Sequence, residues 1–206
     1  MKTHFVTATL WIIWCVIHSA MISLTVTNYL KHKLGDRFRY YRIVFNVVSA
    51  VLLMPIIIYG YNLPGHSLFR WEISIITFQV PLLLAGFLLL LAGARHYDML
   101  QFLGLRQIKT ASSHGALSES GKLDTSGILG KTRHPWYLAA IMLIWSRGFD
   151  FSIVLTNLIL TIYLSVGTIL EERKLLIEYG QDYREYQRNV SMLFPFKWFI
   201  KRPKRP

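Results

Sequence analysis

A short basic turn holds the first side chains that could do chemistry. Residues 130–137 read Gly-Lys-Thr-Arg-His-Pro-Trp-Tyr and lead into an apolar run. Pro135 favours the first turn of a helix, where its missing N–H costs nothing. The N–H groups of that turn carry the positive end of the helix dipole, and Arg133 and His134 stand before it. The turn would therefore bind a carboxylate or a ribose phosphate, or else its basic pair anchors a membrane span.

A pair of adjacent acids, Glu171 and Glu172, follows the next apolar run. A carboxylate at the C-terminal end of a helix opposes the helix dipole, and acidic residues are unusual beside an apolar span. A positive charge must balance them, and Arg133, Arg173, Lys174 or a cationic ligand could supply it. A solvated helix face or a salt bridge is the alternative interpretation.

The sequence lacks the signatures of common soluble enzymes. It has no G-x-G-x-x-G, P-loop, H-E-x-x-H or G-x-S-x-G motif. No two histidines stand at metal-ligand spacing, so we predict no metal site. The histidines are His4, His18, His32, His66, His96, His114 and His134. The single cysteine, Cys15, lies in an apolar run, where we expect it to act as a small buried hydrophobic residue.

The composition indicates a membrane protein. Of the 206 residues 53% are hydrophobic, and the mean hydropathy is +0.36. Several apolar runs approach the roughly 20 residues that a helix needs to cross a bilayer. The net charge of +12 could indicate nucleic acid, but most basic residues lie in loops beside apolar runs. That placement is typical of contacts with anionic lipid headgroups, so we expect membrane lipids and no nucleic acid as partners.

The apolar runs predict an all-α integral membrane protein with five transmembrane helices. The expected spans are residues 5–30, 43–61, 73–93, 136–145 and 151–170. The first run is too long for the apolar region of a signal peptide, so we expect it to be retained. Residues 1–93 would form a three-span scaffold, and residues 94–206 a catalytic region built around the helical hairpin 136–170.

The tail, residues 171–206, is predicted to begin as a helix that continues the last span. Gly180 is the expected bend. Tyr179, Tyr183 and Tyr186 share one helix face, which would either anchor the chain at the membrane interface or line a pocket. His18, on the first apolar helix, is expected to form an interhelical hydrogen bond.

The distribution of charge predicts the orientation in the membrane. Three segments, 31–42, 94–135 and 171–206, hold 20 of the 23 Lys and Arg residues. With five spans these segments share one side, so the positive-inside rule predicts an outside N-terminus and a cytoplasmic C-terminus. We therefore expect the basic turn and the paired acids to meet at the cytoplasmic face of the membrane.

Taken together, the two motifs resemble a known family. An R-H-P-x-Y motif, two spans, E-E-x-x-L, a glycine and two tyrosines before a proline are similar to the isoprenylcysteine carboxyl methyltransferase family. That group includes phospholipid and small-thiol methyltransferases. The matching residues are Arg133–Tyr137, Glu171–Leu175, Gly180, Tyr183, Tyr186 and Pro195. Upstream, residues 14–19 and 39–46 resemble the bacterial branch that holds small-thiol methyltransferases and NnrU-type proteins.

The resemblance implies S-adenosylmethionine as cofactor, bound at the cytoplasmic end of the last two spans. The family's cofactor contacts carry over to Gln107, Gly127, Leu129, Gly130, His134, Pro135, Trp136, Tyr137 and Glu171. Its catalytic positions carry over to Arg133, Glu171 and Glu172, and its acceptor-binding positions to Gly167 and Tyr183. A carboxylate and an aromatic ring suit the cationic parts of such a cofactor.

One position departs from the family pattern. The isoprenylcysteine enzymes have an arginine one helical turn before the paired acids, where this chain has Gly167. Without a guanidinium a prenylcysteine carboxylate loses its bidentate partner. We therefore expect a small or lipophilic acceptor that enters from the bilayer, and a thiol or a lipid amine fits better than a carboxylate.

Two other functions are considered. A non-catalytic accessory or transport protein, as suggested for NnrU-type relatives, would keep the same scaffold. A sterol-type reductase shares a related C-terminal region, but it would need many more spans than 206 residues provide.

Overall fold

The structure of the chain, a computed structural model, describes residues 2–61, 76–110 and 123–200, without the side chains of residues 61, 109 and 110. The described residues form helices and one isolated β-bridge, between Thr132 and Ser191, and no strand. Pro64 and Gly65, a pair that favours a turn, lie outside the described residues, as do the Ser/Gly-rich residues 112–121 and the basic end 201–206.

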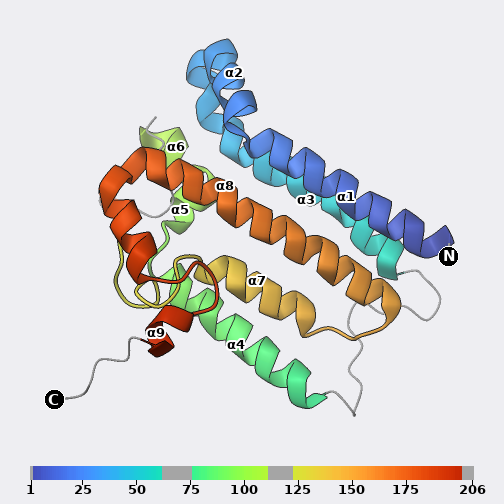
Figure 1. The fold of residues 1–206 in the computed structure, drawn as a ribbon. Coiled ribbons are helices and arrows are strands. Elements are labelled where there is room, and N and C mark those ends of the chain that lie inside the picture. Colours follow the sequence, from blue (N-terminus) through green and yellow to red (C-terminus); the bar gives the residue numbers. More distant parts are fainter. Residues whose placement is uncertain (1, 62–75, 111–122, 201–206) are drawn as a thin grey trace.

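The long helices lie side by side, with α8 in the middle (Figure 1). α8 (Phe151–Asn189) packs against α1 (Lys2–Ile22) on one side and against α7 (Pro135–Trp145) on the other. α3 (Tyr41–Tyr61) covers α1, and α4 (Ile76–Ala94) covers α7. The predicted all-α class and the hairpin of α7 and α8 are confirmed. The division at residue 93 stays a prediction.

The first apolar run does not form a single helix, so the predicted span 5–30 is wrong in its second half. α1 ends at Ile22, and α2 (Leu24–Leu34) begins after Ser23. Ser23 is extended, and its hydroxyl accepts the Val26 N–H at 3.3 Å, the geometry of a helix N-cap. A 3₁₀ helix, η1 (Gly35–Tyr40), then leads into α3.

Two short helices follow α4. α5 (Met99–Leu103) starts where Asp98 accepts the Gln101 N–H at 3.0 Å, and α6 (Leu105–Thr110) follows it. Arg42, at the start of α3, donates to the Phe102 carbonyl at 3.1 Å through Nε. This bond ties α3 to α5 at the end of the bundle that carries the candidate site.

Four stretches of the described chain are long and apolar enough to cross a membrane: α1, residues 24–60, α4 and α8. α7 is apolar but has 11 residues. At 1.5 Å per residue it is about 16 Å long, roughly half of the 30 Å hydrocarbon core. The count of five spans therefore stays a prediction, with α7 as a short arm of the hairpin.

α8 is longer than a membrane crossing and ends in a reversal. Its 39 residues continue beyond residue 170, as predicted for the tail, and Gly180 breaks the helix with φ 55° and ψ −120°. A positive φ favours glycine because it has no Cβ. The part after Gly180 folds back, and α9 (Phe196–Ile200) lies near the start of α7 (Figure 1).

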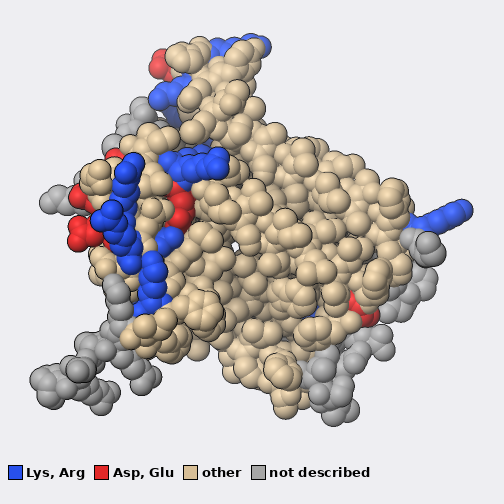
Figure 2. Space-filling view, viewed as in Figure 1, with Lys and Arg blue, Asp and Glu red and all other residues tan. Residues whose placement is uncertain are grey.

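The surface matches a protein that sits in lipid. Large apolar side chains are exposed along α1, α3, α4 and α8, among them Phe5, Val51, Leu88 and Ile162. In Figure 2 most charged side chains gather at the end of the molecule where α2 and the C-terminal part of α8 lie. Exposed apolar helices with charges gathered at an end identify an integral membrane protein.

Candidate functional site

The loop before α7 is fixed by the returning tail. Leu129 is 1% exposed and packs with Leu175, Tyr183 and Tyr186. The Tyr186 hydroxyl donates to the Leu129 carbonyl at 2.6 Å. Burial raises the pKa of Tyr186, so it remains a donor across the ordinary pH range. Tyr179 packs against the same cluster, so the predicted tyrosine face lines this core.

Two glycines of this loop leave little room for a side chain. A Cβ at Gly127, which has a φ of 54°, would lie 2.6 Å from His96 Nε2. A Cβ at Gly130 would lie 3.1 Å from the Thr125 carbonyl. His96 is held in turn by Asp124, 2.8 Å from its Nδ1. The loop therefore lies close against the end of α4.

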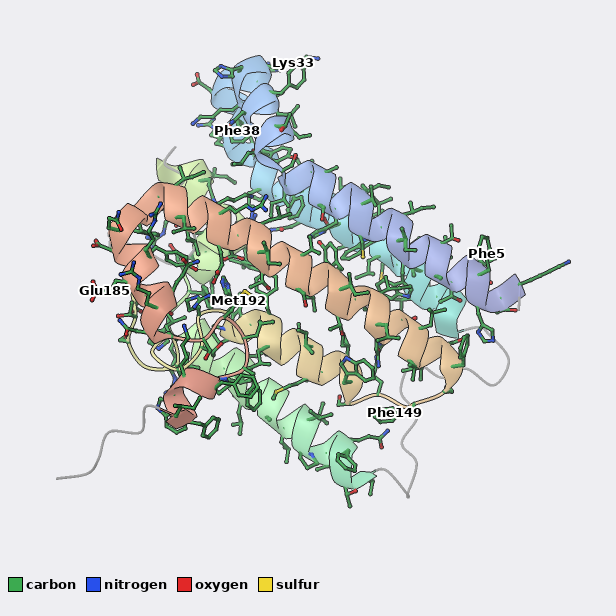
Figure 3. All side chains as sticks on the ribbon, in the orientation of Figure 1. Phe5, Lys33, Phe38, Phe149, Glu185 and Met192 are labelled. Atoms are coloured by element: carbon green, nitrogen blue, oxygen red, sulfur yellow. The ribbon has the colours of Figure 1, made fainter. Side chains whose placement is uncertain are left out.

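The backbone of the basic turn pairs with the segment that follows α8. The N–H groups of Arg133 and His134 donate to the carbonyls of Ser191 and Met192 at 3.0 and 3.1 Å. Figure 3 labels Met192 beside the start of α7. These two amides are already satisfied, so any anion would have to be met by other groups.

Arg133 and His134 contact Glu172 directly. Arg133 reaches Glu172 Oε1 through Nε and Nη2, both at 2.6 Å, and His134 Nε2 lies 3.1 Å from the same oxygen. Tyr183 donates to Oε1 at 3.3 Å, and Gln187 donates to Oε2 at 2.8 Å. The predicted meeting of the basic turn and the acids is confirmed. The basic turn and Glu172 touch directly, with no space for a ligand between them.

This ion pair is largely removed from water. The side chains of Arg133 and His134 are 7% and 1% exposed, and that of Glu172 is 12% exposed. Burial alone would raise the pKa of Glu172, but hydrogen bonds from His134 and Arg133 outweigh it and lower the pKa from 4.5 to about 2. Glu172 is therefore ionised across the ordinary pH range. Its hydrogen bonds link the tail to the α7–α8 hairpin.

Glu171 lies in different surroundings. It interacts electrostatically with Tyr137, Arg42, Lys174 and Tyr97. Lys174 also donates to the Ile22 carbonyl, at the end of α1, at 3.1 Å. Glu171 is half-buried and faces groups from α3, α7 and α8, whereas Glu172 faces the tail.

The two aromatic residues of the basic turn have separate roles. Trp136 donates to the Leu90 carbonyl at 3.1 Å, and a Cβ at Gly93 would lie 2.5 Å from its ring, so it locks α7 onto α4. Tyr137 turns the other way, toward α8. A Cβ at Gly167 would lie 3.3 Å from its Cε1, so the bare glycine makes room for this ring.

Gln107 lies on α6, outside the Glu172 network. Its amide nitrogen donates to the Gln101 carbonyl at 3.0 Å. Its Oε1 is buried, and among the described residues it has no hydrogen-bond partner. A buried acceptor without a donor is costly, and a ligand with an N–H or O–H group would satisfy it.

Sequence reasoning missed Arg42, Tyr97 and Gln187. Arg42 belongs to a basic loop that reads as a membrane anchor, and its separation from Glu171 in the sequence hides the contact. Gln187 reaches Glu172 only because the chain reverses at Gly180. In the described part of the chain no group of three or more His, Cys, Asp or Glu could hold a metal ion.

Fold and site together define an all-α integral membrane protein with a polar cluster at one end of an α7–α8 hairpin. The NnrU protein family matches residues 6–194, and the chain belongs to that family. The predicted resemblance to the bacterial branch near NnrU-type proteins is thereby confirmed. No solved structure gives a significant match.

Curated relatives carry the name methanethiol S-methyltransferase. Methanethiol S-methyltransferase 1 of Bradyrhizobium diazoefficiens is 30% identical over 131 residues, 62% of this chain and 46% of the relative. The Pseudomonas deceptionensis enzyme is 41% identical over 64 residues, 31% and 24% of the two chains. The Mycobacterium tuberculosis enzyme is 27% identical over 144 residues, 69% and 55%. The chain spans about half, or less, of the length of these relatives.

Proposed function

We propose that the protein is an S-adenosylmethionine-dependent membrane methyltransferase whose acceptor is a small thiol. The observation that carries the proposal is the division between the acids: Glu172 is committed to the fold, and Glu171 stays half-buried beside Tyr137 and Gly167. The names of the relatives support both the reaction class and the acceptor.

The residues present fit this cofactor. S-Adenosylmethionine carries a sulfonium, an ammonium, hydroxyls and an adenine amine, all of which seek negative or lone-pair partners. Glu171 offers a carboxylate, and Gln107 offers a buried oxygen that lacks a donor in the described structure. Arg42 and Lys174, both close to Glu171, would meet the cofactor's carboxylate. When bound, the cofactor supplies a methyl group on a positively charged sulfur.

The remaining sites transferred from the family act as a frame for these groups. Gly127, Leu129 and Gly130 keep the loop tight against α4 and the tail, and Pro135 starts α7 at its first position. His134 and Arg133 hold Glu172, and Trp136 holds α4. With the frame fixed, Tyr137 and Glu171 keep one orientation, which is what a displacement reaction requires of an enzyme.

Gly167 supports a thiol as the acceptor. An arginine here would crowd Tyr137, because a Cβ alone would lie 3.3 Å from the ring and the ring would have to shift. The position therefore supplies no charge for an acceptor carboxylate. A small thiol needs none, and the apolar helices would strip water from its sulfur.

The distribution of Lys and Arg supports a cytoplasmic site. The segments around Glu171, Arg42 and the basic turn belong to the three that hold 20 of the 23 Lys and Arg residues. We propose an outside N-terminus and a cytoplasmic C-terminus, in a bacterial inner membrane. Cysteine accessibility labelling at Lys2 and Glu185 would test this, with labelling expected from opposite sides.

Calorimetry of S-adenosylmethionine binding to the full chain in detergent tests the proposal. We expect wild type to bind, and Glu171→Gln to bind at least about tenfold more weakly because a charge partner is lost. Glu185→Gln is the matched control, since Glu185 is an exposed acid on the same helix, labelled in Figure 3. Equal affinity in Glu171→Gln and Glu185→Gln would contradict the assignment of Glu171.

A non-catalytic accessory or transport protein is the competing function. It would keep the Arg133–Glu172 frame but transfer no methyl group. Incubation with methyl-labelled cofactor and methanethiol separates the two, because only an enzyme yields labelled dimethyl sulfide. A folded protein that binds the cofactor and gives no product with thiols or membrane lipids would favour the accessory role.

A further inference from the structure

The side of α8 that carries Glu171 faces α7 and α1. Tyr163, Gly167 and Glu171 stand four residues apart and therefore share a face of this helix. Gly167 and Glu171 meet Tyr137 of α7. Tyr163 lies with its ring 6.1 Å from that of Trp14 and 6.2 Å from that of His18, both on α1.

The register of α1 against α8 brings His18 level with Gly167. His4 pairs with Ser152 near the start of both helices, and the Ile22 carbonyl accepts from Lys174 near the other end. The two helices run parallel, as Figure 1 shows, with a sequence offset of 148 to 152 between paired residues. His18 therefore lies beside residues 166–170.

The imidazole of His18 is held in one orientation. Its Nδ1 lies 3.1 Å from the Ser49 hydroxyl of α3, and Trp14 stacks on it at 4.8 Å between ring centroids. The Phe45 ring lies at 4.8 Å on a tilted plane. Trp14 also donates to the Ser49 carbonyl, so two side chains of α1 hold this residue of α3. The predicted interhelical hydrogen bond of His18 is confirmed.

That arrangement leaves the second ring nitrogen available. His18 Nε2 has no hydrogen-bond partner among the described residues, and the side chain is only half-buried. If Nδ1–H donates to Ser49, the lone pair stands on Nε2. The ionisable groups around it are Arg42 of α3, Tyr163 of α8 and Cys15 of α1. Arg42 interacts with both His18 and Glu171 and would favour an anion between them.

We propose that the acceptor thiol binds between α1, α7 and α8, beside Gly167, and that His18 Nε2 accepts its proton. The proposal rests on the proposed function. The S–H bond breaks, the proton goes to Nε2, and the electron pair stays on sulfur and forms the new S–C bond. The bond from the methyl carbon to the cofactor sulfonium breaks, and its electrons return to that sulfur. The imidazolium then gives its proton to water.

Two thiols of similar size but different acidity test the assignment. Ethanethiol is protonated near neutral pH, whereas 2,2,2-trifluoroethanethiol is far more acidic and needs less help from a base. We expect His18→Asn, whose amide can keep the bond to Ser49, to lose about 100-fold in kcat/KM with ethanethiol. With trifluoroethanethiol the loss should be only a few-fold.

His4→Asn is the matched control. It alters a histidine on the same helix that also pairs with a serine of a neighbouring helix, at the far end of the bundle. We expect its rates with both thiols to stay close to wild type. Equal losses for both thiols in His18→Asn would show that His18 only packs, and no loss would remove it from the reaction. Either result overturns the proposal.

Ring NMR gives a readout without turnover. The protein is labelled at histidine Cε1 and saturated with S-adenosylhomocysteine, which cannot donate a methyl group. Addition of trifluoroethanethiol should move the resonance that His18→Asn removes toward the imidazolium position, in wild type and in His4→Asn. An unmoved resonance would overturn the proposal. If wild type neither binds S-adenosylmethionine nor methylates any thiol, the proposed function itself fails, and this proposal fails with it.

Discussion

Glu171 and Glu172 are neighbours in the sequence, but their carboxylates belong to different parts of the molecule. A step of one residue turns a helix by about 100°. Glu172 thus faces the basic turn and the tail, with partners from Arg133, His134, Tyr183 and Gln187. Glu171 faces Tyr137 and the proposed acceptor site beside α1. The comparison teaches that a pair of acids in a motif can divide its work between holding the fold and meeting a ligand.

The largest effect should come from breaking the Glu172 side. In Glu172→Gln the Arg133 guanidinium stays buried without its counter-charge. Removing one partner of a buried ion pair costs about 3–5 kcal/mol. Thermal unfolding in detergent should show a large fall in stability, and Glu171→Gln should stay near wild type. Equal destabilisation of the two variants would erase the distinction between the acids.

The pH dependence of stability should sharpen the same distinction. The folded-state pKa of Glu172 is lowered from 4.5 to about 2, so the carboxylate form is the one that stabilises the fold. Its contribution is fully present above pH 4.5 and is lost as the pH falls from 4.5 toward 2. As the pH falls through that window, the free energy of unfolding should decrease more steeply for wild type than for Glu172→Gln. Parallel curves would mean that the ion pair contributes nothing.

An intermediate effect is expected on the tail side of the frame. Tyr186→Phe leaves the buried Leu129 carbonyl without its donor, which costs about 1–3 kcal/mol. The unfolding midpoint should drop, and cofactor affinity should remain within a few-fold once the protein is folded. If Tyr186→Phe lost cofactor binding without losing stability, Tyr186 would belong to the cofactor site and not to the structural frame.

The smallest effect is expected at the proposed acceptor site, at Gly167. Gly167→Ala adds a Cβ 3.3 Å from Tyr137 Cε1, closer than an ordinary contact, so the ring must shift by a few tenths of an ångström. We expect kcat/KM for methanethiol to fall about tenfold or less, with unfolding unchanged. Val166→Ala, at an exposed neighbouring position, should leave the rate unchanged. Equal kcat/KM values for the two variants would show that Gly167 does not contact the acceptor.

Local patterns predicted much of the fold. Hydrophobic runs gave α3, α4, α7 and α8 to within a few residues, and Gly180 gave the bend in the tail. The sequence did not indicate the break after α1, because a single serine in an apolar run is well tolerated and only its N-cap geometry makes it a boundary.

The site was predictable as a meeting of motifs but not in its details. The hairpin brings Arg133 and Glu172 together, and that follows from two apolar runs joined by a short turn. The Arg133 and His134 N–H groups donate to the Ser191 and Met192 carbonyls only because the chain reverses at Gly180 and brings residues far apart in the sequence together. Which of two adjacent acids turns toward which neighbour depends on packing that no short pattern records.

A cryo-electron microscopy structure of the full chain in lipid with S-adenosylhomocysteine would test the central claim most directly. The account predicts the ligand in contact with Glu171 and Tyr137, while the Arg133–Glu172 ion pair remains closed as it is here, at 2.6 Å. A ligand lodged between Arg133 and Glu172, with that pair broken and Glu171 untouched, would contradict it.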